Sequence, residues 1–240
     1  AKNAMKKTPK ELMMLESLKS DLRLPSLPAR IECFDNSNFS GSQPVASCVV
    51  FLNGKPCPSE YRHFNIKTVT GPDDFASMEE ILFRRYKRVL EENLELPQLI
   101  IIDGGKGQLN AALKSLEALN LKGKMSVISI AKRLEEIFVP GDPVPVYLDK
   151  HSLSLRLIQQ TRNEAHRFGI TFHKLKRSKA MLTSELDTIK GIGAAAKDKL
   201  LSHFGDMEKI KTASLEELSE VTGKKQGKIV FDYFLRLVVK

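Results

Sequence analysis

The segment "PQLIIIDGGKGQ", residues 97–108, contains four apolar residues in a row that lead directly into a single aspartate. A strand with one solvated face alternates apolar and polar residues, whereas this run is apolar at every position. It is therefore predicted to be a strand buried on both faces. Such a strand lies inside a sheet that has helices on both sides, so the run predicts an α/β domain.

The segments around this run extend the prediction to a mixed sheet. Three strand-like runs precede it, "IECFD" at 31, "VASCVVFLNG" at 45 and "EYRHFNIKTV" at 60. The Gly, Ser and Pro turns between them favour an antiparallel meander. A helix ("LNAALKSLEAL") and a second apolar strand ("MSVISIA") follow it and complete a βαβ unit. The expected fold class is α/β, with a mixed sheet and flanking helices.

Three further helices are expected before residue 180. A short one covers 8–20 and ends at the prolines of "LPSLPAR". A long helix near 153–178 closes the domain, with His166 at the edge of its buried stripe. The third covers 75–94, where helical spacing predicts one buried face and leaves an arc of basic residues. The buried face comprises Phe75, Met78, Leu82, Tyr86 and Val89, and the arc comprises Arg84, Arg85, Lys87 and Arg88.

The last part of the chain differs in character. From about residue 183 it has short helical segments, small apolar residues and Gly-containing turns, including "IKGIG" at 189 and "VTGKKQGK" at 221. We therefore predict two domains, 1–180 and a small all-α domain at 181–240.

The composition favours a polyanionic partner. The formal net charge is +9, and nucleic acid is preferred over an acidic membrane surface because neutralising phosphates releases counterions. The three cysteines lack CxxC spacing, which predicts neither a disulfide framework nor a zinc site and fits a cytoplasmic location. There is no apolar run long enough for a membrane span. The chain does not begin with Met, which suggests a fragment.

The glycine-rich loop after the buried strand matches neither common nucleotide-binding pattern. A P-loop requires GxxxxGK followed by Ser or Thr, and a dinucleotide fold requires GxGxxG, but the loop reads "DGGKGQLN". What remains is Asp103 at the carboxyl end of a parallel strand, where open α/β sheets bind ligands. Small residues there would let a charged backbone approach. The alternative is a tight turn in which Asp103 only caps the next helix.

A second carboxylate strengthens the ligand-binding interpretation. Asp35 ends the first strand, and a mixed sheet can place that strand beside the one that ends in Asp103. Paired carboxylates suit Mg²⁺ or Mn²⁺, which can support hydrolysis of a phosphodiester. The alternative for Asp35 is an Asx turn with Asn36 and Ser37. Asp73 and Asp74 precede a helix, so at least one is expected to be its N-cap or a dipole partner. On periodicity alone, His166 is a packed residue.

Five ordered motifs together resemble one family. The motifs "IECFDNSN", "VASCVVF", "TVTGPDDFASM", "IIIDGGKGQL" and "TRNEAHRFGITFH" are similar to the C-terminal half of UvrC, the nuclease subunit of the bacterial UvrABC excinuclease. The resemblance extends from about residue 20 over nearly the whole chain. It implies a ribonuclease H-like endonuclease domain followed by a tandem helix-hairpin-helix domain.

The resemblance also implies a site and a reaction. Asp35, Asp103 and His166 would form the catalytic centre and bind the Mg²⁺ or Mn²⁺ ion, and Asp74 is implicated with less weight. The implied activity is the incision 5′ to a bulky lesion in double-stranded DNA, after UvrB has marked the site in the pathway that UvrA begins. The chain lacks the family's GIY-YIG nuclease and its UvrB-interacting segment, again as expected for a fragment.

Several residues are expected to hold DNA phosphates without reading sequence. In the first domain these are Lys106, Lys132, Arg133, Arg162 and Arg167. In the second, "IKGIG" resembles a helix-hairpin-helix turn and assigns this role to Gly191, Gly193 and Lys197. The alternatives are solvated surface charges and an ordinary turn between helices. The second hairpin departs from the family pattern, so its contribution is open. Two rival functions stay open. One is a catalytically inactive DNA-binding scaffold, and the other is a different chemistry on the same fold class, such as ATP-dependent phosphoryl transfer, against which the lack of a nucleotide-binding loop argues.

Overall fold

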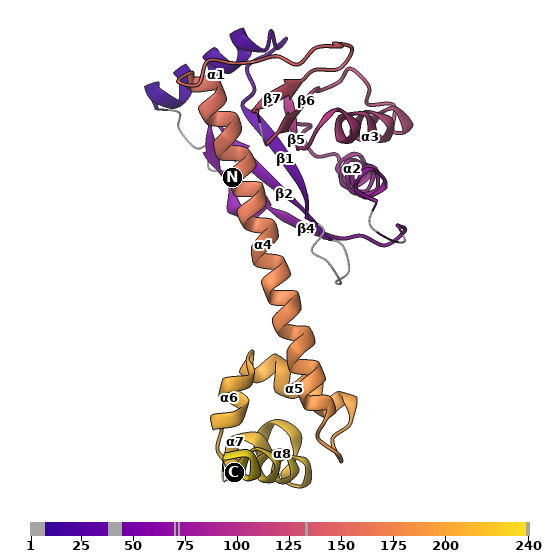
Figure 1. The fold of residues 1–240 in the computed structure, drawn as a ribbon, viewed down its shortest axis with the longest axis vertical. Helices are drawn as coiled ribbons and strands as arrows, with labels where there is room; N and C mark the ends of the chain where they lie inside the picture. The colour runs from indigo at the N-terminus through magenta and orange to yellow at the C-terminus, as the bar shows by residue number, and fades with distance from the viewer. Residues whose placement is uncertain (1–7, 38–44, 70, 72, 133, 239–240) are drawn as a thin grey trace. The chain divides into compact units, whose positions relative to one another are not determined.

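The computed structural model describes residues 8–37, 45–69, 71, 73–132 and 134–238. The chain forms two compact units, 1–172 and 173–240 (Figure 1). This division and the predicted one near residue 180 both lie inside α4 (Leu153–Asp187), which continues past the expected end near 178. A continuous helix has no internal break that hydrophobic periodicity can mark, so the domain boundary stays a prediction.

The first unit is built on a mixed sheet, as predicted. In the described residues its strand order is β3-β2-β1-β5-β6-β7, with β4 also paired to β2. The parallel pairs are β1 with β5 and β5 with β6, and the other pairs are antiparallel. The strands are β1 (Arg30–Ser37), β2 (Val45–Leu52), β3 (Lys55–Pro56), β4 (Arg62–Asn65), β5 (Leu99–Asp103), β6 (Ser126–Ala131) and β7 (Glu136–Phe138), with a short 3₁₀ helix at Pro58–Glu60.

The third predicted strand is shorter than "EYRHFNIKTV" suggested. Only Arg62–Asn65 pairs with β2. Beyond it, the backbone N–H groups of Lys67 and Thr68 donate to the carboxylate of Glu80, at 3.0 and 2.9 Å. A side chain of the next helix thus replaces the partner strand, and the alternating pattern of the sequence could not reveal this.

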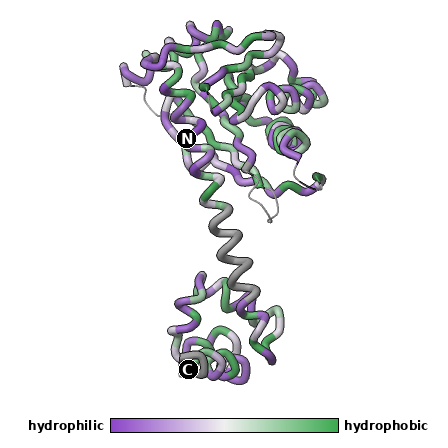
Figure 2. The backbone as a smooth tube through the Cα atoms, in the orientation of Figure 1, coloured by the Kyte–Doolittle hydropathy of each residue, from purple (hydrophilic) through white to green (hydrophobic). Residues whose placement is uncertain are grey.

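Helices cover both faces of the sheet. α1 (Pro9–Asp21) and α4 pack on one face with Cys33 and Ile101, whereas α2 (Asp74–Glu91) and α3 (Lys106–Ala118) pack on the other with Phe34 and Ile102. Figure 1 shows these two layers, and Figure 2 shows apolar stretches along the strands between them. The apolar run at β5 is fully buried from Leu99 to Ile102, as its pattern predicted.

Helix α2 confirms most of its predicted buried face and corrects two positions. Met78, Leu82, Tyr86 and Val89 are buried, but Phe75 in the first turn is 52% exposed. Arg85, which belonged to the predicted basic arc, is buried because its guanidinium pairs with the carboxylate of Glu32 on β1. Periodicity assigns Arg to the polar face and has no means of detecting a buried partner.

The second unit is a small helical domain. Its described helices after α4 are α5 (Ala194–Phe204), α6 (Met207–Thr212), α7 (Leu215–Thr222) and α8 (Lys224–Val238). They enclose their own apolar core, which includes Leu186, Leu200, Ile210 and Val230. Across the described parts of both units, we find no helix with the length and apolar character needed to cross a membrane.

Candidate active site

The sheet brings the two predicted carboxylates together. β1 and β5 pair in parallel with Asp35 directly opposite Asp103. β1 does not end at Asp35 as expected but continues to Ser37, because Asn36 and Ser37 still pair with β2. Because side chains alternate along a strand, Asp35 lies on the same face as Cys33, and Asp103 on the same face as Ile101. That is the face covered by α4. The two carboxylates therefore point to the layer that carries His166.

Helix α4 places His166 against this pair. Its Nδ1 atom lies 3.0 Å from Asp35 Oδ2, and its side chain is 39% exposed. Ser47 fixes the turn of α4 that carries His166. It lies opposite Asp35 on β2, and its buried hydroxyl donates to the carbonyl of Ala165 at 2.8 Å. Ligand atoms of Asp35, Asp103 and His166 lie within 4.8 Å of one another. Sequence reasoning did not detect the role of Ser47, since a serine within an apolar strand carries no distinctive signal.

The residues present fit a divalent cation. Asp103 Oδ2 is buried and has no hydrogen-bond donor. Burial, together with the charge of Asp35, raises the pKa of Asp103, so a cation here would relieve a real electrostatic cost. Carboxylate oxygens are also the ligands that such ions prefer.

Lys132 lies in the same cluster. Its ammonium is 3.3 Å from Asp103 Oδ2, without a hydrogen bond to it, and 3.4 Å from His166 Nδ1. This charge opposes the rise in the pKa of Asp103. The side chain is 54% exposed. Sequence reasoning treated Lys132 only as a phosphate contact and did not foresee that it lies at the carboxylates.

Asp74 does not join the cluster. It begins α2, on the opposite face of the sheet from His166, and its carbonyl accepts a hydrogen bond from the Asn36 side chain at 2.8 Å. Asp73 is the N-cap of α2, as expected for one residue of the pair, and its carboxylate accepts from the N–H groups of Phe75 and Ala76. The catalytic role of Asp74 stays a prediction.

The predicted phosphate contacts of the first domain have different surroundings. Lys106 is exposed at the first residue of α3. Arg167 is exposed but forms two hydrogen bonds of 2.7 Å with Glu164. Arg162 is buried, with its guanidinium 2.8 Å from Glu135, so this geometry gives no support to a phosphate-binding role. Arg133 lies outside the described residues.

Two glycines of the loop are required by contacts within the protein. A Cβ atom on Gly104 would lie 2.8 Å from the Gln108 side chain, and one on Gly107 would lie 2.3 Å from the Phe75 ring. Gln108 is held in place because its Oε1 accepts from the N–H of Gly105 at 3.0 Å. The small residues therefore already serve internal packing, in addition to any approach of DNA that the sequence suggested.

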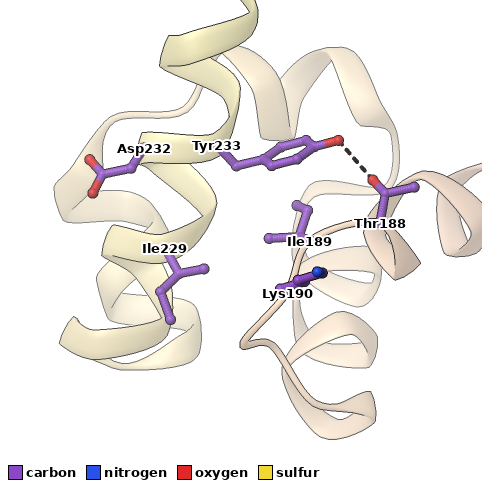
Figure 3. Close-up of a pocket in the computed structure, with 6 residues that line it drawn as sticks. All are labelled: Thr188, Ile189, Lys190, Ile229, Asp232 and Tyr233. Atoms are coloured by element: carbon purple, nitrogen blue, oxygen red, sulfur yellow. Dashed lines mark hydrogen bonds between the residues drawn. The ribbon is translucent and has the colours of Figure 1, made fainter.

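The second unit contains the predicted first hairpin. Gly191 has a φ of +100°, which favours glycine, and Gly193 is the N-cap of α5. The hairpin packs against α8, and the Tyr233 hydroxyl of that helix lies 2.8 Å from the Thr188 hydroxyl. A pocket of about 390 Å³ lies beside this contact (Figure 3). Lys197 is largely buried and pairs with Asp187 at 2.6 Å. Its charge is thus already compensated within the unit.

The second hairpin is a tight turn at Gly223, which has a φ of +90°. Helices α7 and α8 cross closely, since a Cβ atom on Gly227 would lie 2.6 Å from the backbone of Ser219. The exposed lysines Lys224, Lys225 and Lys228 follow the turn. The second hairpin therefore departs from the family pattern in its sequence, but two helices joined by a tight turn still form.

The fold and the comparisons assign the chain to a family. A mixed sheet whose central parallel strands carry paired aspartates near their carboxyl ends, followed by a small helical domain with two hairpins, defines a ribonuclease H-like domain joined to a helix-hairpin-helix domain. The family profile described as "UvrC RNAse H endonuclease domain" matches residues 19–170, and the one described as "SAM-like Helix-hairpin-helix tandem" matches residues 183–228. The chain belongs to the UvrC family.

Curated relatives agree with this assignment. A UvrABC system protein C from Flavobacterium johnsoniae is 58% identical over 92% of this chain, and one from Porphyromonas gingivalis is 53% identical over 96%. The chain spans 37% and 39% of the length of these relatives. Among solved structures, an endonuclease V from Bacillus subtilis covers 67% of this chain and 90% of its own, at 13% identity and a TM-score of 0.36, a likeness too weak to add to the argument.

Proposed function

We propose that this chain is a divalent-metal-dependent DNA endonuclease that hydrolyses a phosphodiester bond at Asp35, Asp103 and His166. The observation that carries the proposal is the cluster of these three residues at the carboxyl ends of β1 and β5. Membership of the UvrC family and the buried Asp103 Oδ2, which accepts no hydrogen bond, support it. An inactive DNA-binding scaffold, the first rival, would have no need to bury two carboxylates opposite each other, where burial raises the pKa of Asp103.

In this proposal each side chain has a defined task. Asp35 and Asp103 would hold Mg²⁺ or Mn²⁺, which would supply activation of a water molecule and stabilisation of charge on the phosphate oxygens. An ionised carboxylate only accepts hydrogen bonds, so Nδ1 of His166 carries the proton in its contact with Asp35. With that proton on Nδ1, the free Nε2 can accept a proton in the reaction, whereas as a ligand through Nδ1 His166 would give up this proton and its hydrogen bond to Asp35. Lys132 offsets the charge of Asp103 and can contact the DNA phosphate.

We infer the wider role from the family. The relatives carry the name UvrABC system protein C, and the proposal is that this chain makes the incision 5′ to a bulky lesion in cytoplasmic DNA repair. UvrB would mark the site before this chain cuts, and UvrA would act earlier in the pathway. A 5′-labelled duplex with one bulky lesion, incubated with UvrA, UvrB and this chain, should give a product that ends on the 5′ side of the lesion. A cut on the 3′ side alone would refute this assignment.

Nicking of supercoiled plasmid DNA separates the endonuclease from the scaffold. If the chain is an endonuclease, it should nick the plasmid in Mg²⁺ or Mn²⁺, and EDTA should abolish the nicking. If it is an inactive scaffold, it should bind the plasmid, seen as a mobility shift, but should not nick it in either metal. Because the plasmid assay needs no partner protein, its result is independent of the lesion experiment.

Removing the second unit is expected to weaken DNA binding. Residues 181–240 contain ten Lys or Arg and nine Asp or Glu, so a chain that ends at Ala180 loses a formal charge of only +1. Bulk charge therefore cannot account for a large loss of affinity, whereas loss of the hairpin amides and lysines can. We expect the Kd for a duplex to rise at least about tenfold, or about 1.4 kcal/mol. An unchanged Kd in a band-shift titration, with the truncated chain still folded by circular dichroism, would remove the hairpins from DNA binding.

A further inference from the structure

Phe75 is an exposed aromatic residue beside the candidate active site. Its helical spacing predicts a buried residue, yet it is 52% exposed. Phe75 follows Asp74, whose backbone carbonyl accepts a hydrogen bond from the side chain of Asn36, the residue after Asp35. The start of α2 is thereby fixed to the end of the first catalytic strand.

The ring of Phe75 packs near the end of the second strand, β5. A Cβ atom added to Gly107 would lie 2.3 Å from Cε1 of Phe75. The edge of the Phe75 ring therefore packs directly against this glycine. Gly107 lies in the first turn of α3, directly after the loop that follows Asp103. Phe75 therefore touches the first turn of α3, which follows β5, while the carbonyl of its neighbour Asp74 accepts a hydrogen bond from Asn36 near the end of β1. It does so from the α2 and α3 side of the sheet, whereas His166 lies on the other side.

We propose that the exposed face of Phe75 stacks on a DNA base next to the phosphate that is cut. This inference rests on the proposed endonuclease function. A strand whose phosphate lies at Asp35 and Asp103 crosses this edge of the sheet, so its neighbouring nucleotide comes within reach of Phe75. The exposed Lys106, next to Gly107, is positioned to hold a flanking phosphate. Every base has an aromatic face, so stacking positions the strand without selecting a sequence.

A purely structural role for Phe75 makes different demands. If the side chain only covered Gly107, any apolar group that packs there would suffice. Stacking requires a flat aromatic ring. Phe75→Leu keeps an apolar cover and removes the ring, and Phe75→Tyr keeps the ring. Phe83→Leu is the matched control, because Phe83 is also exposed on α2, at 37%.

The experiment combines cutting with photocrosslinking. The cut made by the wild-type chain is first mapped in a duplex with Mn²⁺. 5-Iododeoxyuridine, which crosslinks to stacked aromatic side chains on irradiation, is then placed on either side of the cut, and the adduct is located by mass spectrometry. We expect an adduct on Phe75 in the wild type and on Tyr in Phe75→Tyr, and none at this position in Phe75→Leu. Single-turnover cutting should slow about tenfold in Phe75→Leu, be restored in Phe75→Tyr and be unchanged in Phe83→Leu.

The outcomes separate this inference from the function on which it rests. If the wild type fails to cut, the endonuclease proposal fails, and this inference with it. If the wild type cuts, gives no adduct on Phe75 and cuts equally fast as Phe75→Leu, only the stacking role is refuted. Slow cutting by Phe75→Leu with a lowered melting temperature and no rescue by Phe75→Tyr would also refute it, in favour of packing.

Discussion

Replacing Asp103 with asparagine is expected to abolish DNA nicking while the fold and DNA affinity persist. Asparagine keeps the shape of the side chain but removes the charge that holds a divalent cation. Loss of several kcal/mol of charge stabilisation at the phosphate corresponds to at least about a 10³-fold lower nicking rate. Asp35→Asn should behave in the same way, because the two residues are opposite each other in the strand register.

The metal-free protein should not be destabilised by this change. Burial and the neighbouring charge of Asp35 already raise the pKa of Asp103, so the neutral amide removes an unfavourable interaction. Asp142→Asn, at an exposed turn of the same unit, is the matched control for loss of one negative charge. Rates of plasmid nicking, Kd by band shift and melting temperatures provide the comparison. Wild-type nicking by Asp103→Asn would show that the site is elsewhere.

The second large effect is expected on stability, from Arg85→Met. Glu32 is fully buried, and its carboxylate accepts hydrogen bonds from the Arg85 guanidinium at 2.7 and 3.1 Å. Removing one partner of a buried ion pair costs about 3–5 kcal/mol, because the other charge remains in a low-dielectric interior. Arg30 also lies 2.8 Å from Glu32 and retains part of the compensation. We therefore expect a loss of about 3 kcal/mol in the free energy of unfolding.

Arg88→Met is the matched control on the same helix. Arg88 pairs with Glu92 at 2.6 Å, but both side chains are exposed, so the change should cost less than about 1 kcal/mol. Urea unfolding of both variants at neutral pH gives the comparison. Equal effects of the two substitutions would contradict a stabilising role for the buried pair.

The pH dependence of Arg85→Met follows from the pKa of Glu32. Burial favours a higher pKa, but the hydrogen bonds and charges of Arg85 and Arg30 outweigh it and hold the pKa of Glu32 below its ordinary value of 4.5. A folded pKa below the unfolded one gives stability that is present above the unfolded value and is lost as the pH falls through the folded value. The difference between wild type and Arg85→Met should therefore be largest near neutral pH and shrink in acid.

The sequence predicted those parts of the fold that leave a local pattern. The uninterrupted apolar run of β5 and the helical spacing of α2 and α3 are such patterns, and the structure confirms them. It did not predict the inward turn of Arg85, because its partner Glu32 is distant in the chain and becomes a neighbour only after folding. The packing of Phe75 against Gly107 was not predicted for the same reason, since the two residues lie on different helices.

The candidate site shows the same division. Asp35 and Asp103 could be predicted because each lies near the end of a recognisable strand, although only a possible pairing of those strands could be suggested. The parallel register and the shared α4 face required the structure. His166 was assigned through family resemblance, since periodicity gave it an ordinary packing role. Lys132 and Ser47 entered the site only through the fold, because neither residue belongs to a pattern that indicates catalysis.

The most direct test of the metal site is anomalous scattering from a crystal of this chain soaked in Mn²⁺. Manganese has an anomalous signal that identifies its position independently of any activity, and the coordination distances identify its ligands. We expect a peak bounded by carboxylate oxygens of Asp35 and Asp103, and the position of the His166 ring decides between ligand and proton acceptor. A peak at another place, or no peak at these carboxylates at a Mn²⁺ concentration that supports nicking, would contradict the account.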